Sequence, residues 1–256
     1  MCAYALGRTD SMTARQSVEL VETAGAFGGT DEKAFGESAS AGPPDAAASS
    51  AQQENNAVVV AKAAVALLSA VRLLPHIALL LLSPGRALLV SDLSRYAEMY
   101  DDGRPPTGFH LIVFFVRMMT FVPEYRNVFY FRHRSAGHIL ALLCPPMKSL
   151  RLMATTCGPG LFVHHGFGTM VTAEAIGANF TIRQLATVGY ANNATDCPKI
   201  GNNVTVGVGA RVLGGVAVGD NVIVGANSVV IADVPPDLVV MGVPSKVVCQ
   251  RPKRGA

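Results

Sequence analysis

The sequence predicts an α+β protein in which a helical N-terminal region precedes a left-handed parallel β-helix of hexapeptide repeats. Two observations carry this prediction: aliphatic residues recur at every sixth position in the C-terminal half, and helical apolar spacing fills the stretch before it. A period of six fits neither the 3.6 residues of a helical turn nor a simple hairpin meander, and it is typical of a solenoid. Three short strands then form one triangular coil of about 18 residues, and neighbouring coils pair in parallel and bury a continuous core.

The repeat keeps one phase along its whole length. The residue after each aliphatic position is usually small, as at Gly201 and Gly207, and would allow tight corners. Because Ile176 and Ile200 are four steps of six apart, the phase survives the segment 190–198. An ordinary sandwich rich in valine and glycine, the alternative, would not hold this register. The repeated positions are Ile176, Ile182, Val188, Ile200, Val206, Val212, Val218, Val224 and Val230.

Composition divides the chain into four regions. Residues 1–56, rich in Ala, Ser, Gly and Glu, cannot bury enough apolar surface to offset their ordering entropy, so a disordered tail is expected. A helical region over 57–152, a β-helix domain over 153–248 and a basic tail over 249–256 are expected to follow. Within the helical region, helices are expected over 57–83, 93–100, 108–120 and 124–143.

Charge and hydropathy exclude several classes of protein. The net charge of +3, with no basic stripe bearing interleaved aromatics, argues against nucleic-acid binding. No uncharged apolar run reaches about 18 residues, so no transmembrane span is expected. The apolar stretches 57–90 and 109–122 are interpreted as buried helices, with peripheral membrane contact as the alternative. No secretory signal is visible and the five cysteines lack a CxxC pair, which favours reduced thiols in a cytoplasmic protein.

Three segments of the β-helix resemble bacterial serine acetyltransferases, particularly the serine-acetyltransferase-like branch of polysaccharide gene clusters. They read GLFVHHGFGTMVTAEAIGANFTI, IRQLATVGYANNATDCPKIGNNVTVGVGA and VGANSVVIADVPPDLVVMGVPSK, and YRNVFYFR resembles the helical half of that branch. The resemblance implies an acyltransferase that carries the acetyl group of acetyl-CoA to L-serine, making O-acetylserine for cysteine biosynthesis. A homo-trimer or a dimer of trimers is expected, because flat prism faces and apolar helices need cover.

O-acyl transfer needs a base for the hydroxyl proton, donors for the oxyanion and a slot for the pantetheine arm of CoA. His165 is the candidate catalytic base, because imidazole titrates near neutral pH and the resemblance places the family's catalytic histidine there. Gly166 and Gly168 beside it would expose the ring on a tight corner. The alternative is a solvated histidine on a turn.

The acceptor side departs from the family. By the resemblance, His164 stands where serine acetyltransferases carry an aspartate, and Asp196 and Cys197 replace an Arg-His pair. His164, Gln184 and Asp196 are the expected substrate-binding residues. No acid occurs between Leu150 and Pro159, where the family's orienting carboxylate would lie, and Glu174 is the substitute candidate. Three functions therefore stay open: serine acetylation, acetylation of a sugar hydroxyl in capsule or exopolysaccharide biosynthesis, and a non-catalytic β-helix scaffold.

Acetyl-CoA is the expected co-substrate, and no metal is expected. Small residues would let the pantetheine lie along the backbone, although the repeat itself also demands small residues; Lys246 would meet the CoA phosphates. The expected CoA contacts are Gly207, Ala210, Gly225, Ala226 and Lys246. His164 and His165 have no zinc spacing with the cysteines, and adjacent residues on a strand are expected to point in opposite directions. No cysteine synthase complex is expected, because the family's tail ends in isoleucine and this chain ends in Ala256.

Overall fold

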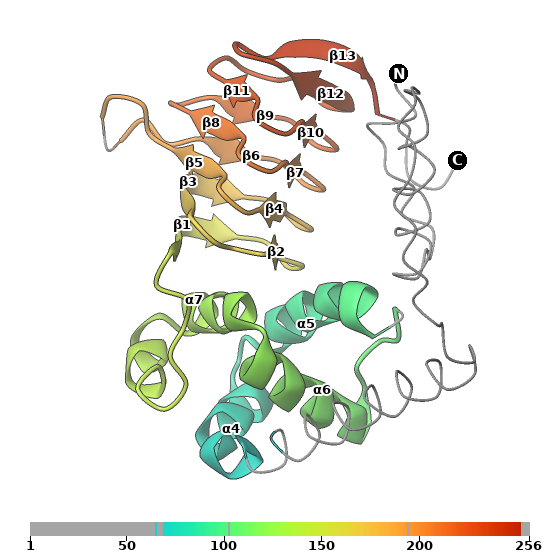
Figure 1. Ribbon diagram of the computed structural model, residues 1–256, viewed down its shortest axis with the longest axis vertical. Helices are drawn as coiled ribbons and strands as arrows, with labels where there is room; N and C mark the ends of the chain where they lie inside the picture. The colour runs from blue at the N-terminus through green and yellow to red at the C-terminus, as the bar shows by residue number, and fades with distance from the viewer. Residues whose placement is uncertain (1–64, 66–68, 102, 194, 252–256) are drawn as a thin grey trace, which may run out of the picture. The chain divides into compact units, whose positions relative to one another are not determined.

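The computed structural model describes residues 65, 69–101, 103–193 and 195–251, and it combines helices with a parallel β-helix (Figure 1). The expected disordered tail, residues 1–56, lies outside these described residues, as do residues 252–256 of the expected basic tail. The helices are α4 (Leu74–Leu82), α5 (Arg86–Tyr100), α6 (Gly108–Phe121) and α7 (Pro123–Leu140).

Proline and glycine set the helix boundaries. Val122 has φ −117° and ψ 90°, outside the helical region, because the following Pro123 disfavours helical backbone at the residue before it. Pro123 then opens α7 at a position that needs no backbone N–H. The helices expected over 108–120 and 124–143 are confirmed within a few residues, whereas α5 begins seven residues earlier than expected, directly after Gly85. A non-helical residue, Arg134 (φ 36°), kinks α7.

No single helix in the described part of the chain is long and apolar enough to cross a membrane. The helices α4 and α5 meet the length and composition requirement only when taken as a pair, and they are bent by 115° relative to each other.

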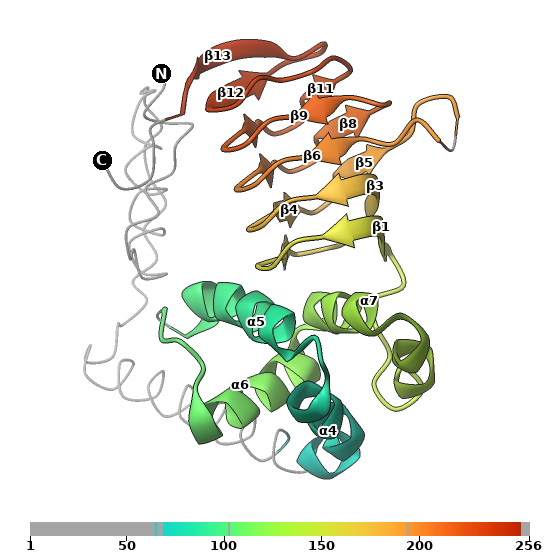
Figure 2. The same cartoon turned by 180° about the vertical axis from the view of Figure 1, so that it is seen from behind.

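Short strands follow the helices in a regular series, stacked coil on coil (Figure 2). They are β1 (Leu150–Cys157), β2 (Phe162–His164), β3 (Thr169–Ile176), β4 (Thr181–Arg183), β5 (Thr187–Gly189), β6 (Lys199–Ile200), β7 (Thr205–Val206), β8 (Arg211–Leu213), β9 (Ala217–Val218), β10 (Ile223–Val224), β11 (Val229–Val230), β12 (Leu238–Met241) and β13 (Lys246–Gln250).

The strand pairing makes the coils of a β-helix. One sheet has the order β13-β12-β10-β7-β4-β2, and the other has β11-β8-β5-β3-β6-β9 with β1 beside β3. Because β1 and β3 are each eight residues long, they pass around a corner and contribute to two faces of the prism. Pairing between these strands is parallel except for the last pair, β12 with β13. The predicted fold class, helices followed by a β-helix of hexapeptide repeats, is confirmed.

The core of the β-helix consists of the repeated aliphatic positions. All nine are buried, with at most 5% of each residue exposed, at Ile176. The small residues beside them are needed because the backbones of neighbouring coils nearly touch. A Cβ on Gly177 would lie 2.6 Å from the carbonyl carbon of Gly201, closer than real contacts allow.

A second core fills the helical region and contacts the first coil of the β-helix. Its largest fully buried members include Tyr96, Tyr125 and Phe129, and Phe162 of β2 belongs to it. A buried ion pair between Arg132 and Asp92 links the helices to the first coil. The guanidinium donates to Asp92 Oδ2 at 2.8 Å and to Oδ1 at 2.9 Å. Asp92 Oδ1 also accepts the backbone N–H of Leu161 at 2.7 Å, so α5, α7 and the entry to β2 are held together.

The cysteines agree with the expectation of reduced thiols at three positions. Cys144, Cys157 and Cys197 are free, and burial raises the pKa of Cys157 to about 11. Cys2 lies outside the described residues.

Candidate active site

His165 stands on the corner that joins β2 to β3, with its side chain exposed. Its backbone has φ 60°, a left-handed conformation that turns the chain sharply and is uncommon outside glycine. Gly166 follows in a tightly packed position, where a Cβ would lie 2.9 Å from Leu150 Cδ2 and 3.1 Å from Glu124 Cγ. Local backbone and close packing therefore project His165 outward from a rigid corner.

The rings of His164 and His165 lie on the same side of this corner. Their centroids are 4.0 Å apart and their planes are inclined by 33°. The expectation that adjacent histidines point in opposite directions is wrong here, because the left-handed backbone of His165 ends the strand alternation at that residue. In the described part of the chain, no three His, Cys, Asp or Glu side chains gather as metal ligands would.

His164 is an uncharged ring at neutral pH. Burial, together with the nearby charges of His165 and Arg183, lowers the pKa of His164 to about 4. Arg183 is its register partner on β4. A group that loses its proton so readily can accept or donate a hydrogen bond but offers no charge to a substrate.

The candidate carboxylates do not contact the histidine pair. Glu174 pairs with Lys199 at 3.1 Å, so it does not take the role expected for it within one chain. Among the described residues, neither His164 nor His165 forms an ion pair with an acid. Glu124, in the first turn of α7, is buried behind the corner with its Cγ near Gly166. Sequence reasoning missed it because it lies on a helix far upstream of His165.

Several expected site residues share one edge of the prism with His165. Backbone hydrogen bonds link successive corners along this edge: Leu185 N to Phe167 O at 2.8 Å, Gly209 N to Gln184 O at 3.0 Å, and Asn227 N to Val208 O at 2.8 Å. Val229 N to Gly242 O, at 2.9 Å, extends the edge to the final hairpin. The structure therefore brings the following expected residues onto the edge of His165: Gln184, Gly207, Gly225, Ala226 and Lys246.

The residues of this edge differ in what they offer a ligand. Gln184 Oε1 is buried without a hydrogen-bond partner, whereas Ala226 and Lys246 are exposed. Gly207 has a structural reason to be glycine, because a Cβ there would lie 2.8 Å from Ala226 N.

Ala210 does not fit the expected role in CoA binding. It is fully buried in the core, its N–H donates to Gly207 O at 3.2 Å and its carbonyl accepts Thr187 N at 2.9 Å. Because its side chain points inward and its backbone groups are already bonded, Ala210 has no group left for a ligand.

Asp196 lies on a different edge of the prism. It belongs to the segment that joins β5 to β6 and projects from the β-helix (Figure 2). Its carboxylate covers the corner after β8, where a Cβ on Gly215 would lie 2.3 Å from Asp196 Oδ1. Within one chain, the structure therefore does not bring Asp196 together with His165.

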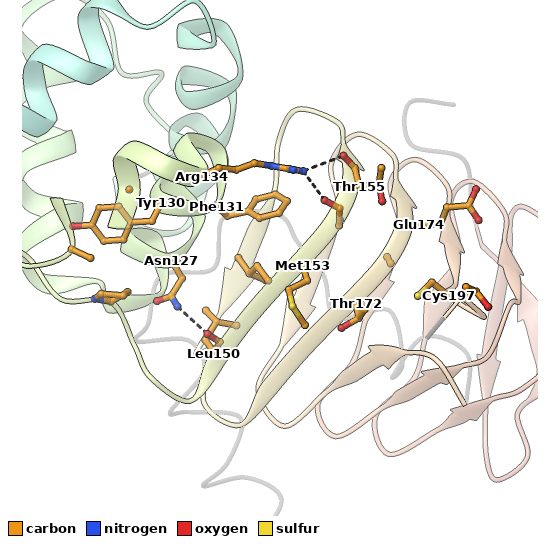
Figure 3. A pocket seen from close by; sticks show the side chains of 17 residues that line it. Asn127, Tyr130, Phe131, Arg134, Leu150, Met153, Thr155, Thr172, Glu174 and Cys197 are labelled. Atoms are coloured by element: carbon orange, nitrogen blue, oxygen red, sulfur yellow. Dashed lines mark hydrogen bonds between the residues drawn. The ribbon is translucent and has the colours of Figure 1, made fainter. Parts of the chain in front are cut away.

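A groove of about 1050 Å³ separates α7 from the outer surface of β1 and β3 (Figure 3). It runs from Asn127 and Tyr130 on α7, past Met153 and Thr172, to Thr195 and Cys197 of the projecting segment. Thr172 Oγ1 is buried there without a partner. His165 does not line this groove, so the groove and the exposed histidine are separate features of one protomer.

Comparisons with known proteins agree with this architecture. Residues 197–232 match the family model of the bacterial transferase hexapeptide (six repeats). A serine acetyltransferase of Synechococcus elongatus is 42% identical over 94 residues, which cover 36% of this chain and 38% of that protein. One from Staphylococcus aureus is 41% identical over 96 residues, covering 36% and 45% of the two chains. The chain thus spans less than half the length of the curated relatives it matches.

Solved structures show the same fold over a longer stretch. The crystal structure of Neisseria gonorrhoeae serine acetyltransferase has a TM-score of 0.53 and 24% identity, covering 67% of this chain and 69% of that one. The same enzyme in complex with serine has a TM-score of 0.51 and 25% identity, covering 66% and 71%. The resemblance to serine acetyltransferases drawn from the sequence is confirmed.

Proposed function

We propose that this protein is an acetyl-CoA-dependent O-acetyltransferase with L-serine as its first candidate acceptor. The observation that carries the proposal is the exposed imidazole of His165 at one end of a continuous edge of small-residue corners. The local identity to serine acetyltransferases, at 42% over the matched residues, supports the same chemistry. With serine as the acceptor, the product would be O-acetylserine, which would serve cysteine biosynthesis. A CoA thioester as the donor implies a cytoplasmic enzyme.

In the proposed reaction, a ring nitrogen of His165 takes the proton of the acceptor hydroxyl. The hydroxyl oxygen attacks the carbonyl carbon of the acetyl thioester and forms a tetrahedral oxyanion. The carbon–sulfur bond then breaks, the acetyl group stays on the acceptor oxygen, and the imidazolium returns its proton to the CoA sulfur. Proton transfer by imidazole suffices for this step, so the proposed mechanism uses no metal.

The edge below His165 is the proposed track for CoA. The exposed corner at Gly225 and Ala226 leaves the backbone open to the pantetheine arm, and Gly207 continues the same line. Lys246, exposed at the start of β13, is placed to meet the phosphates. Ala210 is left out because it is buried. On the acceptor side we place Gln184, with its unpartnered Oε1, and His164.

The proposed assembly is a homo-trimer or a dimer of trimers with shared active sites. Exposed apolar side chains flank the His165 corner, among them Phe167, Met170 and Leu185. A second copy of the chain could bury such an apolar patch. If the two copies meet head to tail, three copies can close into a ring. The groove between α7 and the projecting segment would receive this edge of the neighbouring copy.

A sugar hydroxyl is the second candidate acceptor, favoured by one specific observation. Serine carries an ammonium group, which a site usually holds with a carboxylate. Here the His165 corner has Arg183 beside it, and Asp196 covers Gly215 on another edge. A neutral polyol would need no anion at this position. A β-helix that only scaffolds partners is the remaining alternative, and it predicts no turnover.

The proposal is tested by incubating the purified protein with acetyl-CoA and a panel of L-serine and sugars while free thiol release is measured. His165→Ala should lower kcat by about two to four decades, the usual effect of losing a positioned base, with little change in acetyl-CoA affinity. His110→Ala is the matched control, because His110 is a histidine of α6 that pairs with Asp101. Unchanged turnover in His165→Ala would remove His165 from the mechanism.

A further inference from the structure

Within the described part of one chain, the proposed base is not held in place by an acid. His165 is exposed, so its ring could turn about two side-chain bonds. General-base catalysis depends on holding that ring in a productive geometry, since small misplacements are costly. In many histidine-based sites a carboxylate does this, but no acid among the described residues pairs with His165.

His165 instead ends a stack of rings. Its ring lies 4.0 Å from that of His164, and the His164 ring lies 5.9 Å from the Phe162 ring at an inclination of only 22°. Phe162 and His164 are two residues apart on β2, so their side chains leave the strand on one face. The ring of His164 is thus held between a buried phenylalanine and the proposed base.

The stack continues into the helical core. Phe162 is 6% exposed, and its ring meets Tyr96 of α5 edge-on at 4.7 Å. Tyr96 is fully buried, and its hydroxyl lies 3.3 Å from both the N–H and the carbonyl of Val163. Tyr125 of α7 packs edge-on against Tyr96 at 5.0 Å. Two helices and a strand therefore fix the base of the stack.

We propose that His164 is the positioning residue of this site: its ring, supported by Phe162 and Tyr96, holds the His165 ring for proton transfer. This inference rests on the proposed function, since it gives a role to the proposed base. It also gives the helical region a role in the site, because residues of α5 and α7 would position a residue of the β-helix.

The electrostatics of the pair suit this role. Because burial, His165 and Arg183 lower the pKa of His164, its ring stays neutral at the pH at which imidazole bases work. The imidazolium that forms on His165 during proton transfer then meets no like charge from its neighbour. A stacked neutral ring restrains the base without competing for its proton.

Glu124 is the competing candidate for holding His165. Its side chain lies behind Gly166 and only 7% of the residue is exposed. Its carboxylate makes no hydrogen bond or ion pair with the described residues. The charge of Glu124 acts on two tyrosines of α5. Burial is the main cause that raises the pKa of Tyr96 and of Tyr100, and the negative charge of Glu124 adds to it.

Three variants of the full chain separate these two candidates: His164→Ala, His164→Phe and Glu124→Gln. Removing the ring in His164→Ala should lower kcat about 10- to 100-fold, while KM for acetyl-CoA changes less than about 2-fold. Phenylalanine preserves a flat ring without hydrogen-bonding atoms, so His164→Phe should recover most of the lost kcat. Glu124→Gln should leave kcat and its pH profile as in the native chain.

A second measurement needs no turnover. In the substrate-free protein, NMR shifts of the His165 ring protons report the neighbouring ring. His164→Ala should remove this ring-current contribution, and His164→Phe should keep one. Equal loss of kcat in His164→Phe and His164→Ala, or a drop in Glu124→Gln as large as that in His164→Ala, would overturn the proposal. If the native protein acetylates no acceptor, the proposed function fails, yet the ring shifts still decide whether His164 orders His165.

Discussion

The β-helix and the helical region are stabilised in different ways. In the β-helix, each coil repeats the same contact: an inward aliphatic side chain stacks on its counterpart in the next coil, and the core holds only aliphatic and small residues plus Phe180. In the helical region, one aromatic cluster and one buried ion pair join residues that lie far apart in the chain. A repeated contact spreads stability over many equal positions, whereas a single contact concentrates it in a few side chains.

The largest expected effect comes from the ion pair at the junction. Arg132→Met leaves Asp92 buried without its cation, and burial already raises the pKa of Asp92 despite the guanidinium. Losing one partner of such a pair costs about 3–5 kcal/mol. Chemical denaturation measures the free energy of unfolding.

Arg134→Met provides the matched control on the same helix. Arg134 is exposed, and its contacts are to the carbonyls of Ala154 at 3.1 Å and Thr155 at 3.3 Å. We expect a change within about 0.5 kcal/mol for this surface position. Equal losses for the two arginines would mean that the Asp92 pair does not concentrate stability as the comparison claims.

A smaller effect is expected from glycine positions, and it should differ between the two regions. In the β-helix, a Cβ on Gly201 would lie 2.8 Å from Asp220 N, so Gly201→Ala must push two coils apart. Such overpacking costs about 1–3 kcal/mol. In the helical region, a Cβ on Gly85 would meet Ser83 Oγ at an ordinary 3.6 Å, so Gly85→Ala should change stability by less than about 0.5 kcal/mol. Thermal melts of both variants test the contrast, which a neutral Gly201→Ala would refute.

The smallest expected effect is a dependence on pH to which histidines of both regions contribute. Burial lowers the pKa of His76 and of His133 in the helical region below the ordinary 6.5, and it lowers the pKa of His164 on β2 of the β-helix to about 4. As pH falls below 6.5, the unfolded chain takes up these protons before the folded chain does, so stability is lost below that pH and is present above it. We expect a loss under about 1 kcal/mol per histidine between pH 7 and pH 5.5.

Melts at several pH values, followed by tyrosine signals, measure this loss, because Tyr96, Tyr125 and Tyr130 lie in the helical core. His76→Gln should flatten the pH dependence, since His76 is fully buried and its Nε2 lies 3.0 Å from Tyr130 Oη. His110→Gln serves as the control, because His110 lies outside that core. The same slope in all three proteins would exclude His76 as a source of the acid sensitivity.

The sequence by itself determined the β-helix and its core. A period of six is visible in the sequence alone, so the nine aliphatic positions could be assigned inward from the repeat, and all nine are buried. The structure then shows Gln184 and Gly225 at corners of one edge, because residues one coil apart stack. Ala210, which was expected to contact CoA, lies at a core position of the repeat and has no group left for a ligand.

Only the tertiary structure decided the surroundings of His165. The left-handed backbone of that residue brings its ring onto His164, a geometry that strand alternation does not predict. Glu124 and Tyr96 reach the same corner from α7 and α5, and Asp196 turns away from it to cover Gly215. These contacts join segments with no common period, so they depend on how the helices pack against the first coil, which pattern alone does not encode.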